Sequence, residues 1–226
     1  HRADVRLLSL MDHTPGQRQF RDEAKLRTYY RGKKAGLSDA ELDALFAQRV
    51  AFQAAHADDN YRALVGLARA RGVPLASHDD TTLDHVADAV RDGIAIAEFP
   101  TTPEAAAGLH AAGVRVMMGA PNLVRGGSHS GNVATVDLAH TGVLDILSSD
   151  YVPASLLAAV LRLPEAAPEI DLAAAVRTAS KTPAEAVGLT DRGEIAPGKR
   201  ADLIRVRDVD GVAAVRRVWC AGRRVA

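Results

Sequence analysis

Three short apolar runs in this chain each end at side chains that can bind a metal ion. They are residues 5–13, 73–80 and 143–150, and the metal-binding side chains are those of His13, His78 and Asp150. A continuous apolar run is typical of a strand that is buried on both faces of a parallel sheet. Because the carboxyl ends of parallel strands meet at one edge, we expect the three side chains to converge there. Two imidazoles and a carboxylate suit a divalent metal.

Each of these side chains also has an ordinary structural interpretation. His13 could simply cap the loop that continues through Pro15 and Gly16. The two carboxylates after His78 could orient its imidazole, or they could cap and begin the next helix. Asp150 could be a helix cap before Pro153. The sequence of any one segment leaves these alternatives open.

Strand-like and helix-like segments alternate along most of the chain. The five strand-like runs before residue 150 are 5–13, 73–77, 94–99, 114–118 and 143–148. Helical patterns separate them, including a long one from the capping box at residues 38–41 to about residue 71, which a break near residues 58–60 could divide. This alternation predicts an α/β fold with a parallel sheet.

The predicted architecture is a partial (β/α)₈ TIM-like barrel, formed by its C-terminal strands. A closed barrel needs eight strands and about 250 residues, whereas this chain has 226 residues and begins at His1, close to a strand. We therefore interpret it as a fragment, with the first strands missing or supplied by a partner chain. We expect the barrel part to cover residues 1–189. Residues 190–226 alternate in the manner of strands and predict a small β-sandwich appendage.

The overall composition excludes several classes of protein. The 28 basic and 28 acidic residues cancel, which argues against binding to nucleic acid or to a membrane surface. No apolar run approaches the roughly 20 residues that span a bilayer. The single cysteine, Cys220, cannot form an internal disulfide, so we expect a cytoplasmic protein. The sequence leaves open whether the protein forms a homo-oligomer.

Two segments carry candidate anion-binding groups. Residues 119–131 form a Gly- and Ser-rich loop in which backbone N–H groups and Arg125 could contact phosphate, although an ordinary flexible loop explains the composition as well. A basic stretch follows His13, and its first member, Arg18, is the one expected to face a polyanionic substrate. The predicted substrate-binding residues are Arg18, Asn122, Arg125, Ser128, His129 and Ser130.

Together these segments resemble the amidohydrolase superfamily, and within it a branch that acts on a ribosyl triphosphate in phosphonate metabolism. The resemblance lies in residues 9–20, 75–80, 97–102, 118–132 and 145–151, and residues 192–203 are similar to the C-terminal signature of the superfamily. It implies that His13 and His78 are the metal ligands of strands five and six. Asp150 is similar to the strand-eight aspartate, which binds metal and acts as the catalytic base. The strand-one and strand-four ligands of the superfamily have no counterpart here.

The resemblance implies a metal-dependent diphosphatase with two divalent metal ions, Zn²⁺ or Mn²⁺. The expected reaction is hydrolysis of the 5-triphosphate of α-D-ribose 1-methylphosphonate to the 5-phosphate and pyrophosphate. Asp150 would accept the proton of the attacking water. We expect the 226 residues alone to be inactive, because half of the expected ligands are absent from them.

Two other functions remain open at this point. One is hydrolysis of a C–N bond by a dihydroorotase-like or deacetylase-like enzyme of the same superfamily. Assays of pyrophosphate release and of cyclic amide hydrolysis distinguish it from a diphosphatase. The other is a non-catalytic scaffold that keeps the barrel half without its chemistry. A scaffold is expected to purify without bound metal.

Overall fold

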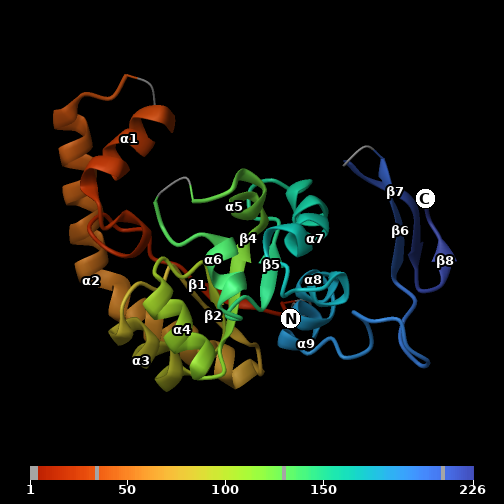
Figure 1. Cartoon of the computed structure of the whole chain (residues 1–226). Helices are drawn as coiled ribbons and strands as arrows, with labels where there is room; N and C mark the ends of the chain where they lie inside the picture. The colour runs from red at the N-terminus through yellow and green to blue at the C-terminus, as the bar shows by residue number, and fades with distance from the viewer. Residues whose placement is uncertain (1–4, 34–35, 129–130, 210–211) are drawn as a thin grey trace.

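Five parallel strands form one sheet, and their order in the sheet follows their order in the chain (Figure 1). The computed structural model describes residues 5–33, 36–128, 131–209 and 212–226. The strands are β1 (Leu8–Leu10), β2 (Leu75–His78), β3 (Ile94–Glu98), β4 (Arg115–Gly119) and β5 (Ile146–Ser148). All five strands that the sequence predicted before residue 150 are present. Both central runs are strands, and they lie side by side between β2 and β5.

Helices cover one face of this sheet. They are α2 (Asp39–Arg71), α3 (Leu83–Asp92), α4 (Pro103–Ala111) and α6 (Thr135–His140). Leu75, Ala97 and Val116 of the strands pack on this side against Ala89 of α3 and Leu109 of α4. A sheet whose strands follow chain order, with its crossover helices on one face, has the winding of a barrel and not of a doubly wound sheet.

The opposite face of the sheet has a smaller core. Ala76, Ile96 and Ile146 point to this side, and they pack with Ala186 and Val187 at the end of α9 (Lys181–Ala186). These strand residues alternate with the residues that face the helices, as the two-residue period of a strand requires. Burial on both faces explains why the strands read as continuous apolar runs.

Shortening Ile96 is expected to destabilise the sheet. Ile96 lies in the central strand β3 and is 1% exposed. Ile96→Ala removes buried methyl groups and leaves a cavity, so we expect the free energy of unfolding to fall by about 2–5 kcal/mol, and by about 0.5–1.5 kcal/mol for Ile96→Val. Chemical denaturation followed by circular dichroism measures both. Equal effects of the two substitutions would contradict this account of the core.

Helix α2 is continuous over 33 residues and is joined to α1 (Glu23–Lys33) in a helical hairpin that extends from the sheet (Figure 1). Its capping box is formed, because the Ser38 hydroxyl accepts from the backbone of Glu41 and the Glu41 carboxylate accepts from that of Ser38. The break that the sequence suggested near residues 58–60 is absent. Leu26 and Tyr30 of α1 pack on Leu42 and Phe46 of α2, and this packing stabilises the hairpin.

A hydrogen bond between α2 and α3 makes a pH-dependent contribution to stability. The Tyr61 hydroxyl donates to the Asp92 carboxylate at 2.8 Å. Burial, together with this bond to Asp92, raises the pKa of Tyr61 to about 12. Since an unfolded tyrosine has a pKa of about 10, the stabilisation is complete below that pH and is lost as the pH rises through the pKa of the folded protein.

Tyr61→Phe is therefore expected to lower the free energy of unfolding by about 1–2 kcal/mol at neutral pH. The difference between the two proteins should shrink as the pH approaches about 12. Urea denaturation at a series of pH values measures it. A difference that stays constant from neutral to strongly alkaline pH would contradict the assignment.

The Gly-rich segment after β4 contains a short helix that the sequence did not predict. Helix α5 (Ala120–Arg125) begins directly after Gly119 and ends at Gly126, whose φ of +85° favours glycine. Helices α7 (Ser155–Ala166) and α8 (Leu172–Ala179) follow β5. Leu123 of α5 packs with Leu147 of β5 and with Leu163 of α7. This packing fixes one wall of the pocket described below.

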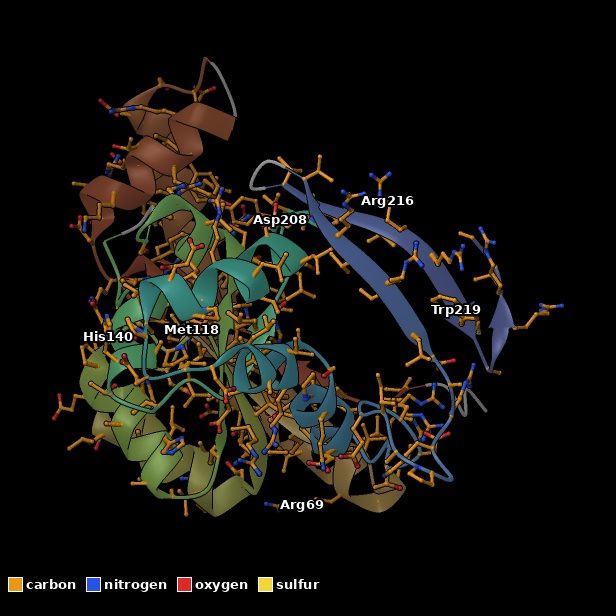
Figure 2. The ribbon with its side chains drawn as sticks, turned by 45° about the vertical axis from the view of Figure 1, so that its right-hand side comes forward. Arg69, Met118, His140, Asp208, Arg216 and Trp219 are labelled. Atoms are coloured by element: carbon orange, nitrogen blue, oxygen red, sulfur yellow. The ribbon has the colours of Figure 1, made fainter. Side chains whose placement is uncertain are left out.

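The C-terminal part, which the sequence predicted to be a small β-sandwich appendage, contains one small antiparallel sheet. Its strands are β6 (Leu203–Val209), β7 (Val212–Cys220) and β8 (Arg223–Arg224). Figure 2 shows Arg216 and Trp219 on this long ribbon beside the helical body. Lys181 of α9 donates to Glu194 at 2.6 Å and so links the body to the segment that leads into the ribbon. The boundary at residue 190 stays a prediction. None of the helices in the described ranges has the length and apolar character needed to cross a membrane.

Candidate metal centre

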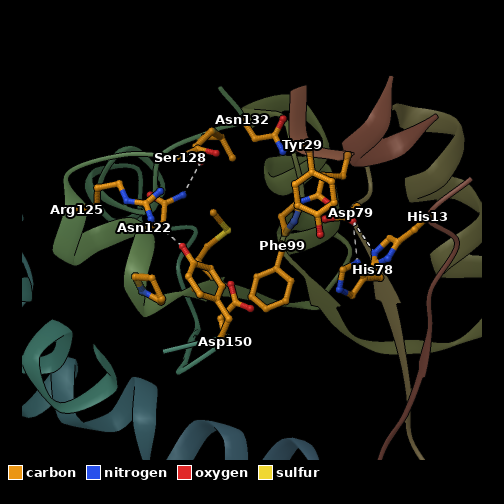
Figure 3. Close-up of a pocket in the computed structure, with 17 residues that line it drawn as sticks. His13, Tyr29, His78, Asp79, Phe99, Asn122, Arg125, Ser128, Asn132 and Asp150 are labelled. Carbon is orange, nitrogen blue, oxygen red and sulfur yellow. Dashed lines mark hydrogen bonds and ion pairs between the residues drawn. The ribbon is translucent and has the colours of Figure 1, made fainter. Parts of the chain in front are cut away.

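The carboxyl ends of β1 and β2 bring two imidazoles and a carboxylate together (Figure 3). Asp79 Oδ2 lies 2.9 Å from His78 Nδ1 and 3.4 Å from His13 Nε2. The centroids of the two imidazole rings are 5.1 Å apart. One ligand atom from each of the three residues lies within 4.8 Å of the other two, and no other such group occurs in the part of the chain that the structure describes. We call these three residues the His-His-Asp cluster.

The backbone around His78 and Asp79 is held in an unusual conformation. His78 is the last residue of β2, and Asp79 has a φ of +56°, a left-handed conformation that non-glycine residues rarely adopt. The Asp79 N–H donates to the Glu98 carbonyl at 2.8 Å, and the Thr81 hydroxyl donates to the Asp79 carbonyl at 3.0 Å. These bonds stabilise a turn that directs the buried Asp79 carboxylate toward both imidazoles.

The loop that carries His13 is fixed by its neighbour Asp12. The Asp12 carboxylate accepts from the Thr14 backbone at 2.9 Å and from the Gln53 side chain of α2 at 3.1 Å. Burial alone would raise the pKa of Asp12, but these hydrogen bonds outweigh it and the pKa is lowered. The Phe20 and His13 rings pack edge to face, with centroids 5.6 Å apart. His13 therefore leaves β1 on a loop that is held from both sides.

The electrostatics of the cluster are those of a buried ion pair. Burial lowers the pKa of His78, but the Asp79 carboxylate outweighs it and the pKa lies above its ordinary value. Burial likewise raises the pKa of Asp79, and the two imidazoles outweigh it and lower that pKa. Asp79 is 2% exposed, so its charge needs a compensating partner.

The donor set of the cluster fits a divalent metal ion. Imidazole nitrogen and carboxylate oxygen are ligands that Zn²⁺ and Mn²⁺ accept. His78 Nδ1 and Asp79 Oδ2 are 2.9 Å apart and form an ion pair. Neither atom makes a hydrogen bond to any of the described residues. A bound cation would provide both of these buried polar atoms with a partner.

Asp150 lies on the same pocket as the cluster but is not a member of it. It follows β5, has a φ of +48°, and its Oδ2 lies against Gly119, where a Cβ would be 3.1 Å away. Strands β3 and β4 separate β2 from β5, and three strand spacings amount to roughly 14 Å. The structure thus brings His13 and His78 together and places Asp150 across the cavity (Figure 3).

A cavity of about 630 Å³ joins the cluster to Asp150 and to a polar wall. Phe99, Met118 and Val133 form its apolar part, and Tyr29 of α1 closes one side. Its polar wall consists of Asn122, Arg125, Ser128, Asn132 and Tyr151. The cavity has the size of a small-molecule site.

The predicted substrate-binding residues differ in where they lie. Arg125 donates to the Tyr151 hydroxyl at 2.9 Å and is exposed on the cavity wall. The Asn122 amide donates to Val133 and accepts from the backbone of Thr135, so Asn122 also fixes the wall. Ser128 lines the cavity. His129 and Ser130 lie outside the described residues.

Arg18 has a different environment from the one expected. It is absent from the described lining of the cavity, and its guanidinium instead donates to the His78 carbonyl at 2.8 Å and to Asp80 at 2.7 Å. Several lining residues escaped sequence reasoning, among them Asp79, Tyr29 and Tyr151. Asp79 was considered for orienting an imidazole or for capping the next helix, although its place directly after His78 was a signal. Tyr29 and Tyr151 carried no signal beyond being next to other candidates.

The sequence of this chain matches one known protein family over most of its length. The model of the Amidohydrolase family matches residues 25–225, which include strands β2 to β5 of the sheet and the C-terminal ribbon. The chain belongs to the amidohydrolase family. This membership confirms the superfamily resemblance that the sequence motifs indicated.

The chain is 49% identical over 225 residues to the α-D-ribose 1-methylphosphonate 5-triphosphate diphosphatase of Escherichia coli strain K12. The match covers 99% of this chain and 59% of that relative. Adenine deaminases also match over shorter stretches. That of Methylobacterium nodulans is 54% identical over 52 residues, which is 23% of this chain and 9% of that protein. That of Gluconobacter oxydans is 39% identical over 90 residues, which is 40% of this chain and 13% of that protein.

Solved structures share the fold. An amidohydrolase from Thermotoga maritima MSB8 superimposes with a TM-score of 0.57 at 18% identity, over 97% of this chain and 62% of that one. The ochratoxinase of A. niger gives a TM-score of 0.51 at 16% identity, over 71% of this chain and 43% of that one. The α/β fold class is therefore confirmed for this amidohydrolase.

Proposed function

We propose that this chain carries the catalytic pocket of a metal-dependent diphosphatase that hydrolyses the 5-triphosphate of α-D-ribose 1-methylphosphonate to the 5-phosphate and pyrophosphate. The observation that carries the proposal is the single cavity in which the His-His-Asp cluster faces Asp150 and Arg125. Support for the substrate comes from the 49% identity to the E. coli diphosphatase along 99% of the chain.

The residues of the cluster would hold a divalent metal, with His13, His78 and Asp79 as ligands and Zn²⁺ or Mn²⁺ as the ion. When bound, such an ion supplies Lewis-acid chemistry that makes water a nucleophile near neutral pH and offsets phosphate charge. The expected second ion and the role of Asp150 as a ligand to it remain part of the proposal.

Asp150 takes the proton of the attacking water. The oxygen of this water forms a bond to the α-phosphorus, the bond between that phosphorus and the oxygen bridging to the β-phosphorus breaks, and pyrophosphate leaves with the bonding electron pair. Asp150 suits this transfer because its exposed carboxylate lines the cavity.

The polar wall provides contacts for the phosphate chain. Arg125 is a planar donor of several N–H groups and suits two oxygens of a phosphate, and the Tyr151 hydroxyl orients it from 2.9 Å. Ser128 adds a hydroxyl on the same wall. The apolar side chains of Phe99 and Met118 line the cavity and limit its water content. A cytoplasmic location, expected from the single cysteine, completes the proposal.

Hydrolysis of a C–N bond is the second candidate, and the short matches to adenine deaminases favour it. A deaminase would use the same cluster on a purine carbon and release ammonia. The polar wall with Arg125 favours an anionic substrate over a neutral base.

The test uses a chimera, because the chain spans 59% of the E. coli relative. In this chimera the matched segment of the relative is replaced by this chain. The chimera is loaded with Zn²⁺ or Mn²⁺ and incubated with the ribosyl triphosphate, and products are followed by ³¹P NMR. We expect one pyrophosphate for each 5-phosphate, and no turnover after a chelator has removed the metal. The 226-residue chain is assayed alone in parallel, and no turnover is expected from it.

Release of single orthophosphates would contradict the proposed bond cleavage. Release of ammonia from adenine without pyrophosphate formation would favour the deaminase alternative. A chimera that purifies without metal and binds none would favour the scaffold alternative.

A further inference from the structure

Arg18 connects the loop after β1 to the loop after β2. Its Nη1 atom donates both to the His78 carbonyl at 2.8 Å and to Asp80 Oδ1 at 2.7 Å. The side chain is 20% exposed, and its own backbone has a φ of +50°. The loop that carries His13 is thereby joined directly to the residue that carries the second imidazole.

Asp80 is a fixed acceptor for this contact. Its side chain is 1% exposed, and its other carboxylate oxygen accepts from the Ser77 hydroxyl. Its backbone carbonyl accepts from the Thr101 N–H at 2.8 Å, which connects the same turn to the loop after β3. A buried carboxylate with this many contacts does not move easily, so the position of Arg18 is defined.

The contact lies at the strained turn. The Arg18 bond to the carbonyl of His78 holds the peptide immediately before Asp79, whose φ is +56°. The next peptide is held by the Thr81 hydroxyl on the Asp79 carbonyl. A left-handed aspartate is strained and persists only where its surroundings hold it.

We propose that Arg18 is a positioning residue, which with Asp80 sets the spacing and orientation of His13, His78 and Asp79. This inference rests on the proposed metal-binding function, and it replaces the substrate contact that the sequence suggested for Arg18. Contacts that orient metal ligands typically change metal affinity when they are removed. Arg18 thus acts through the ligands, and Arg125 remains the guanidinium that faces the cavity.

The test measures Zn²⁺ affinity by competition with a chromophoric chelator, on the 226-residue chain and on the chimera. Arg18→Gln and Asp80→Asn are each expected to lower the affinity by roughly 10- to 100-fold. The double variant should bind Zn²⁺ no more weakly than the single variant with the lower affinity, because the two residues act as one pair. Arg18→Lys should recover part of the loss, since an ammonium can reach Asp80 but lacks the planar fork.

Arg21→Gln is the matched control. Arg21 also reaches this region, through a 3.2 Å bond to the Thr101 hydroxyl, but it touches neither the peptide of His78 nor Asp80. Its Zn²⁺ affinity should stay within about twofold of the wild type. Circular dichroism and thermal denaturation check that each variant is folded. If Arg18→Gln does not fold, the Zn²⁺ affinity of Arg18→Lys provides the test.

A second readout separates positioning from substrate binding. Pyrophosphate affinity at saturating Zn²⁺ should be unchanged in Arg18→Lys. Unchanged Zn²⁺ affinity together with weakened pyrophosphate binding would overturn the proposal in favour of a substrate contact. Additive losses of Zn²⁺ affinity from Arg18→Gln and Asp80→Asn would also overturn the proposal. If the wild type binds no Zn²⁺ at all, the proposed metal-dependent function is wrong. That result is distinct from a failure of the positioning role alone, in which the wild type still binds Zn²⁺.

Discussion

Asp150→Asn in the chimera is expected to reduce the rate of pyrophosphate release by roughly 10²- to 10⁴-fold, the usual contribution of a catalytic base. The asparagine amide is nearly the same size as the carboxylate and fits beside Gly119, but it cannot accept the proton of water at neutral pH. The measurement is kcat from a continuous pyrophosphate assay at saturating metal and substrate.

Asp58→Asn is the control for this substitution. Asp58 is an exposed residue of α2 that is absent from the described lining of the cavity, and its replacement makes the same chemical change. Its kcat should equal that of the unsubstituted chimera. If Asp150→Asn retained full kcat while only raising KM, Asp150 would be a binding residue and the proposed proton transfer would be wrong.

His78→Ala and His13→Ala are expected to lower Zn²⁺ affinity by more than about 100-fold, beyond the loss typical of residues that merely orient ligands. Each substitution removes one of three donors and leaves the buried Asp79 carboxylate with one imidazole. Competition with a chelator measures the affinity, and metal content after dialysis gives an independent value.

His140→Ala is the matched control for the two imidazole substitutions. His140 is paired with Glu169 at 2.6 Å and is absent from the described lining of the cavity. Its replacement should leave Zn²⁺ affinity unchanged. Equal Zn²⁺ binding by the wild type, His13→Ala and His78→Ala would exclude the His-His-Asp cluster as the metal site.

The strands and the edge at which the candidate residues lie could be predicted from the sequence. Apart from Arg115, the residues of these strands are buried or half-buried. Each apolar run is therefore visible in the sequence without knowledge of its neighbours, and the residue that ends the run is visible with it. His13 and His78 follow from this reasoning. The capping box at Ser38 and Glu41 likewise located the start of α2, because a cap is a local interaction.

The helix α5 and the continuity of α2 could not be predicted in the same way. Gly and Ser in residues 119–131 favour a loop locally, yet Leu123 packs on Leu147 and Leu163, and this burial stabilises a helix of 6 residues. The acidic pair at residues 58–59 suggested a break in α2, but these positions are exposed and cost the helix little.

The amino-acid sequence by itself determined which residues end the strands, and therefore that two imidazoles and several carboxylates gather at one edge of a parallel sheet. Only the tertiary structure decided which of these side chains contact one another. It paired Asp79 with both imidazoles, placed Asp150 across the cavity, and paired Arg18 with Asp80. The physical reason is that periodicity and caps act within a few residues, whereas these pairings depend on strand spacing and on a left-handed turn that contacts from three separate loops hold in place.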